Sequence, residues 1–181
     1  MTQALAYGCF LKKLKEAAMR QLKVYLDTSV INFLFAEDAP DFRAVTVDFF
    51  KNTSSRHLLF VSRVVLAEIS NDPDEQHRRH LLGVLNEYSV ALLPTDREAE
   101  VERLARDYMT DGAIPVSKPA DAMHVAYSTI HDMDVLLSWN FKHLANIRRE
   151  ERVMAVNIRN GYRLPLRIVS PLEMGDEDNE L

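Results

Sequence analysis

Short β-prone runs alternate with helical segments along almost the whole chain, and this rhythm constrains the fold more than any other feature. Strands are predicted at 22–26, 58–62, 89–93, 135–139 and 166–169. Helices are predicted between them at 28–36, 42–51, 63–70, 74–88, 95–112, 117–132 and 140–160. Parallel strands need crossover connections, which are usually helical. The alternation therefore predicts an α/β fold in which helices cover both faces of a central parallel sheet.

The length and composition predict one domain with two short ends. The chain has 181 residues, of which 47% are hydrophobic, and this is enough to bury a single core. Residues 1–21 form an N-terminal extension with an amphipathic helix expected at 10–21, and Met19 leaves open a later translation start. Residues 22–172 carry the alternation. The acidic C-terminal tail, 173–181, is expected to fray.

The cysteine count and the apolar runs predict a cytoplasmic protein. Cys9 is the only cysteine, which excludes an internal disulfide framework and favours a reducing compartment. No apolar run approaches the roughly 20 residues that span a bilayer, so we expect no membrane segment. Near the N-terminus, lysines follow the apolar stretch at 4–11, which is the reverse of the order in a secretory signal.

Basic residues are concentrated near the C-terminal end, although the formal net charge is −5. Between residues 142 and 167 there are seven Lys or Arg residues and two acids. A solvated helix face and a phosphate-contacting surface explain this pattern equally well. The candidates for contact with substrate phosphates are Lys142, His143, Arg148 and Arg149.

Three acids and one amide fall where an α/β sheet of this kind binds ligands, beyond the carboxyl ends of its strands. Asp27 follows the first predicted strand, and Glu68 lies in the helix after the second. Asp121 lies in the first turn of the helix that leads to the fourth strand, and Asn140 follows that strand. The topology therefore predicts that these side chains converge.

Each acid alone also has a purely structural explanation. Asp27 suits a helix N-cap, and Asp121 suits the positive end of a helix dipole. Glu68 borders the buried stripe of its helix and needs a cation, but Arg63, five residues earlier, is poorly placed to supply it. Carboxylates gathered at one place bind hard cations such as Mg²⁺ or Mn²⁺, which can assist phosphodiester hydrolysis.

Four motifs, YLDTSV, VVLAEI, DAMHVA and LLSWNFKHL, occur in an order and rhythm that resembles a PIN domain. The resemblance covers about 22–172 and is greatest to the bacterial and archaeal branch that includes VapC-type toxins. It implies a three-layer α/β/α sandwich, Mg²⁺ or Mn²⁺ in an acidic pocket, and endonucleolytic cleavage of RNA. It also implies a homodimer and, for a toxin of a type II pair, a cognate antitoxin.

The resemblance assigns catalytic and metal-binding positions to Asp27, Glu68 and Asp121. A fourth metal position falls on Asn140, where many family members have Asp. Ser29 and Ser138 match hydroxyl positions of the family and are secondary candidates, since a Ser in such a turn is more often a cap.

Other classes of protein fit the sequence less well. A haloacid-dehalogenase-like phosphotransferase would need an acid at position 29, and Ser29 stands there. No glycine-rich phosphate loop follows the first strand. The six histidines, including the pair His77 and His80, are expected at the surface, and Trp139 in the core. Asn140 keeps open a PIN-fold binding or regulatory protein with a weakened or inactive metal site.

Overall fold

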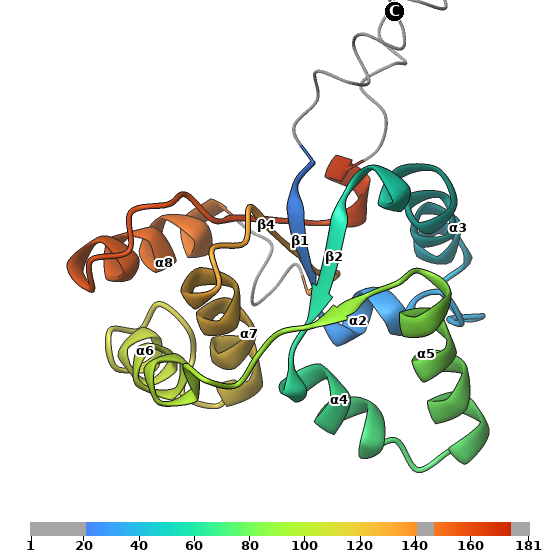
Figure 1. Ribbon diagram of the computed structural model, residues 1–181, viewed down its shortest axis with the longest axis horizontal. Helices are drawn as coiled ribbons and strands as arrows, with labels where there is room; N and C mark the ends of the chain where they lie inside the picture. The colour runs from blue at the N-terminus through green and yellow to red at the C-terminus, as the bar shows by residue number, and fades with distance from the viewer. Residues whose placement is uncertain (1–20, 141–146, 175–181) are drawn as a thin grey trace, which may run out of the picture.

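The computed structural model describes residues 21–140 and 147–174, which form a parallel five-stranded sheet (Figure 1). The strand order is β3-β2-β1-β4-β5, and every neighbouring pair is parallel. The strands are β1 Lys23–Leu26, β2 Leu58–Val61, β3 Ala91–Leu92, β4 Val135–Leu137 and β5 Arg167–Val169. The α/β fold with a central parallel sheet is therefore confirmed.

Helices cover both faces of this sheet, so the predicted three-layer sandwich is also confirmed. The helices are α2 Thr28–Asn32, α3 Pro40–Asp48, α4 Arg63–Ser70, α5 Glu75–Glu87, α6 Glu98–Thr110, α7 Pro119–Ile130 and α8 Ile147–Arg159. In Figure 1, α6, α7 and α8 lie on one side of the strands, and α2, α3 and α5 lie on the other. No helix in the described ranges is long and apolar enough to cross a membrane.

The strand order reverses direction between β1 and β4, and this switch point is where an open α/β sheet forms its ligand crevice. The two strands are in register, with Leu26 opposite Leu137. The backbone N–H of Asp27 donates to the carbonyl of Leu137 over 3.0 Å, which extends the pairing by one residue. The segments that follow β1 and β4 therefore leave the sheet side by side.

Several elements are shorter than the sequence pattern predicts, because local turns end them. The strand expected at 89–93 is reduced to β3, since Ser89 has a positive φ of 51° and Val90 N–H donates back to Leu85 over 2.8 Å. The helix expected to extend to residue 36 ends at Asn32, after which Leu34 and Phe35 form turn hydrogen bonds.

The second predicted helix also differs at both ends. It starts earlier, at Pro40, because proline is favoured in the first helical turn. After Asp48 it widens into a π-helical turn at Phe49–Thr53, which is followed by a 3₁₀ turn at Ser54–Arg56. A further 3₁₀ turn, Pro171–Met174, follows β5.

Some predictions lie outside the described residues. These are the helix at 10–21, the start of the helix expected at 140–160, and most of the acidic tail. The division into an extension at 1–21, a domain at 22–172 and a tail at 173–181 therefore stays a prediction.

Candidate metal centre

Asp27 stands at the end of β1 and is both a helix cap and a part of the candidate site. Its carboxylate accepts hydrogen bonds from the backbone N–H of Ser29 over 3.2 Å and from the Ser29 hydroxyl over 3.1 Å. The hydroxyl of Ser138 also donates to Oδ2 of Asp27. Asp27 is only 7% exposed. These three donors fix the carboxylate in one orientation.

The two serines also join the segments after β1 and β4. The hydroxyl of Ser29 accepts the backbone N–H of Trp139 over 3.0 Å. The hydroxyl of Ser138 accepts the backbone N–H of Asn140 over 3.0 Å. Both hydroxyls therefore donate to the carboxylate of Asp27 and lie beside it. Ser29 also accepts from the segment after β4, whereas Ser138 accepts from its own segment.

Glu68 projects from α4 toward the same place. Its Oε2 accepts a hydrogen bond from the Thr28 hydroxyl and lies 3.1 Å from Nε2 of His124. Partial burial acts to raise the pKa of Glu68, but the contacts with His124 and Thr28 outweigh it and lower the pKa. Arg63 instead forms an ion pair of 3.6 Å with Glu98, so the nitrogen that faces Glu68 comes from His124 on another helix.

His124, on α7, is the site residue that the sequence analysis missed. It is 1% exposed, so the expectation that all histidines lie at the surface is wrong for this residue. Its Nε2 lies 3.8 Å from Oδ1 of Asp27 as well as beside Glu68. The available signal was spacing: His124 is three residues after Asp121, which puts both on one side of a helix.

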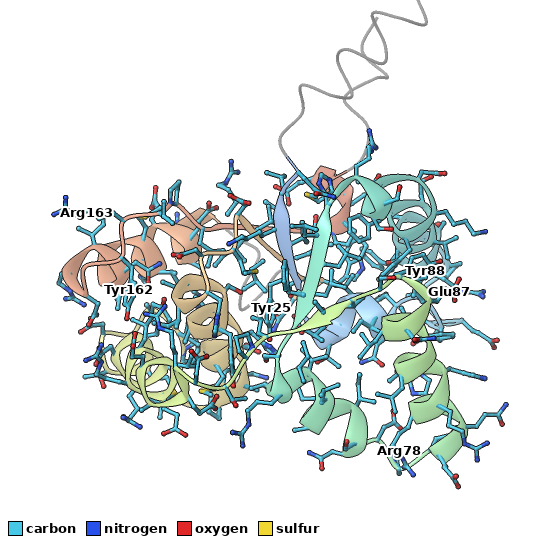
Figure 2. The ribbon with its side chains drawn as sticks, viewed as in Figure 1. Tyr25, Arg78, Glu87, Tyr88, Tyr162 and Arg163 are labelled. Atoms are coloured by element: carbon cyan, nitrogen blue, oxygen red, sulfur yellow. The ribbon has the colours of Figure 1, made fainter. Side chains whose placement is uncertain are left out.

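A series of buried hydrogen bonds fixes His124 on the side of the ring that faces away from the carboxylates. Its Nδ1 lies 2.8 Å from the hydroxyl of Tyr25, which lies 2.6 Å from the hydroxyl of Ser62. Ser62 caps α4 by accepting the backbone N–H of Val64 over 3.2 Å. Figure 2 shows Tyr25 inside the molecule, near the end of β1. This series of hydrogen bonds thus joins the imidazole to the start of the helix that carries Glu68.

The electrostatics of these buried residues follow from the charges around them. Burial, the largest effect, raises the pKa of Tyr25 well above its ordinary value, so the phenol stays neutral. Burial also acts to lower the pKa of His124. The hydrogen bond to Glu68 and the negative charges of Asp27, Glu68 and Asp121 outweigh that effect and raise it.

Three of these side chains form one compact group. Asp27, Glu68 and His124 each offer one ligand atom, and these atoms all lie within 4.8 Å of one another. We call them the Asp–Glu–His group. Asp121 and Asn140 form a half-buried pair beside it, in which Nδ2 of Asn140 donates to Oδ2 of Asp121 over 3.3 Å. The structure therefore brings two of the predicted acids together and pairs the third with the amide.

The basic candidates are placed only in part. Lys142 and His143 lie outside the described residues, and Arg148 is exposed on α8. Arg149 is half-buried and donates to the backbone carbonyl of Ala113. Burial lowers the pKa of Arg149, a nearby arginine adds to this, and the charge of Asp121 opposes it. The start of α8 is therefore within electrostatic reach of Asp121.

Trp139 is a core residue, as expected. It is 6% exposed, its indole N–H donates to the hydroxyl of Thr46 over 2.9 Å, and its ring packs edge-on against Phe42. The residue therefore anchors the segment after β4 and is not available as a stacking platform for a base.

The family of the chain follows from a comparison of its sequence with family models. The model of the PIN domain matches residues 24–161, which is most of the chain. The chain belongs to the PIN domain family. PIN domains are generally nucleases and typically use divalent metals, and the Asp–Glu–His group lies within the matched residues.

A solved structure with a similar fold is that of VapBC2 from Rickettsia felis bound to a DNA fragment from their promoter. The similarity has a TM-score of 0.50 at 15% sequence identity, and it covers 82% of this chain and 98% of the other. At this identity the likeness supports the PIN fold alone. No curated protein matches the chain.

Proposed function

We propose that this PIN domain is a metal-dependent endoribonuclease that hydrolyses phosphodiester bonds of RNA. The observation that carries the proposal is the convergence of Asp27 and Glu68, with His124, at the carboxyl end of the sheet. Open α/β sheets bind ligands at this end, and clustered carboxylates are typical ligands of the hard divalent cations that nucleases use.

The donor set fits a divalent cation. In the described part of the chain, the ion pairs of Asp27 and Glu68 are formed with His124 and not with Lys or Arg. Two carboxylates in one partly buried site repel each other, and a bound cation relieves that repulsion. The side chain of Glu68 is 34% exposed, so this side of the group is open to solvent. Mg²⁺ or Mn²⁺ is the expected ion.

The residues around the group orient its ligands before any substrate arrives. Ser29 and Ser138 fix the carboxylate of Asp27, and Thr28 fixes that of Glu68. When bound, a divalent ion would supply stabilisation of the negative charge that develops on a phosphate group. Preorganised ligands favour this chemistry, because the site does not have to rearrange as the charge develops.

The substrate would lie across the rim formed by the Asp121–Asn140 pair and the start of α8. Arg148 is exposed there, and Arg149 lies within electrostatic reach of Asp121. Both can contact phosphates, as can Lys142 and His143 by their place in the sequence. The choice of RNA over DNA rests on the family resemblance.

The biological setting is part of the same proposal. The resemblance to VapC-type toxins, together with the fold shared with a VapBC2 structure, favours the toxin of a type II toxin–antitoxin pair. That role would require a cognate antitoxin, and the same resemblance favours a homodimer. With one cysteine and an RNA substrate, the expected compartment is the cytoplasm.

One second function is favoured by a specific observation. Asn140 stands where many PIN domains have an acid. Its side chain is an uncharged amide, so it cannot offset the positive charge of a metal ion. This favours a PIN-fold binding or regulatory protein whose metal site is weakened or inactive. Such a protein would bind RNA without cleaving it, and Asp27→Asn would change binding only through stability.

Cleavage of mixed-sequence single-stranded RNA distinguishes the two functions. We expect cleavage with Mn²⁺, loss of cleavage with a chelator, and loss of cleavage in Asp27→Asn. The matched control is Asp134→Asn, because Asp134 accepts the backbone N–H of Lys23 over 2.8 Å at the opposite end of the sheet. Cleavage that survives the chelator, or an equal loss in the control, refutes the proposed mechanism.

A further inference from the structure

We propose that His124 is a direct ligand of the divalent ion, so that the metal centre is a mixed Asp–Glu–His site and not an all-oxygen one. The inference rests on the proposed function, because it takes metal binding at this site as given. It differs from the family resemblance, which assigns the ligands to three acids and the position of Asn140.

The separations between the ligand atoms suit a single ion. Nε2 of His124 lies 3.1 Å from Oε2 of Glu68 and 3.8 Å from Oδ1 of Asp27. Two ligands that each lie about 2.1 Å from an ion, at right angles, are about 3 Å apart. The imidazole nitrogen therefore faces the same point as both carboxylates. Oδ2 of Asp121, in contrast, is directed to the amide of Asn140.

The support behind His124 is of the kind that metal-binding histidines have. Such histidines almost always use the second ring nitrogen for a hydrogen bond that fixes the tautomer and the ring orientation. Here that partner is the hydroxyl of Tyr25, 2.8 Å from Nδ1, which is held in turn by Ser62. Nε2 is thereby directed to the carboxylates.

The same series of hydrogen bonds also helps to position Glu68. Ser62 caps the N-terminus of α4, and Glu68 lies on that helix. The orientation of the imidazole and the position of the Glu68 carboxylate are therefore set by one buried connection.

A nitrogen ligand alters metal preference in a predictable way. Imidazole binds later transition metals well, whereas Mg²⁺ prefers oxygen ligands. We therefore expect the site to favour Mn²⁺ over Mg²⁺, and Co²⁺ over Mn²⁺. Replacing His124 should reduce the affinity for Mn²⁺ by about tenfold or more and that for Mg²⁺ by about threefold or less.

The test is pulsed electron paramagnetic resonance of the full chain loaded with Mn²⁺, together with calorimetry of Mn²⁺ and Mg²⁺ binding. We expect nitrogen hyperfine coupling in the wild type and its loss in His124→Phe. If that variant does not fold, His124→Gln replaces it, because glutamine keeps hydrogen-bonding groups but has no imidazole nitrogen. The control is His143→Phe, which should retain the coupling, since His143 lies three residues after Asn140 and the inference gives it no place among the ligands.

Two results overturn the inference and leave the nuclease standing. The first is Mn²⁺ binding without nitrogen coupling, in a protein that still cleaves RNA only with metal. The second is coupling that is lost in His143→Phe but retained when His124 is replaced. If the wild type binds no Mn²⁺, the inference and the proposed function both fail.

Discussion

Tyr25→Phe tests how much the buried hydrogen bonds behind the candidate metal centre contribute to folding. The tyrosine is fully buried, and its hydroxyl contacts both Ser62 and His124. Phenylalanine keeps the ring and its packing, so the substitution removes only the hydroxyl. The change is therefore a measurement of two hydrogen bonds at the centre of the molecule.

The expected magnitude follows from which partners lose their hydrogen bonds. Ser62 still accepts the backbone N–H of Val64, so its hydroxyl keeps one partner. Nδ1 of His124 loses the bond to Tyr25 in a site that is 1% exposed. Leaving one buried polar group without a partner costs about 1–3 kcal/mol. In a protein of this size the melting temperature should fall by about 2–12 °C.

The assay is thermal unfolding of the metal-free protein, followed by urea unfolding to obtain the free energy. The matched control is Tyr162→Phe, because the hydroxyl of Tyr162 donates to Glu100 over 3.3 Å at the outer edge of the molecule (Figure 2). That change should stay within about 0.5 kcal/mol. If Tyr25→Phe is as stable as the wild type, the hydrogen bonds of Tyr25 with Ser62 and His124 do not stabilise the fold.

Two further predictions concern the rim of the site. Asn140→Asp replaces the amide that donates to Asp121 with a second carboxylate, and we expect calorimetry to show Mn²⁺ binding tightened by about three- to tenfold. Equal affinities would place Asn140 outside the metal centre. Arg148→Gln removes an exposed cation of α8 and should reduce the slope of log affinity for RNA against log salt by about 1. An unchanged slope would exclude Arg148 from the RNA-binding surface.

The fold and the place of the candidate site could be predicted from the sequence because both follow from local pattern. The strand period and the helical stripes specify a parallel α/β sheet, and residues at the carboxyl ends of parallel strands must meet at one edge. Asp27 is therefore placed by the run VYL before it, with no tertiary information. Glu68 follows from its position on the next crossover.

His124 could not be assigned in this way, since its environment depends on long-range packing. It lies on α7 among small residues, and the local sequence alone does not distinguish a buried histidine there from the surface histidine that we expected. Its partner Tyr25 is 99 residues away in the chain, and Glu68 is 56 residues away. The predicted length of β3 was wrong for a more local reason. The left-handed backbone conformation of Ser89 has no clear signal in the run SVALL.

The strand order has a consequence for biosynthesis. The candidate ligands come from α4, α7 and the residue directly after β1, and the hydroxyl of Ser138 that fixes Asp27 comes from the segment after β4. A nascent chain therefore lacks a complete centre until β4 has left the ribosome and paired with β1. Under the proposed function, a nuclease built in this way would stay inert while it is being translated, and a prematurely terminated fragment would not cleave the RNA of the cell that makes it.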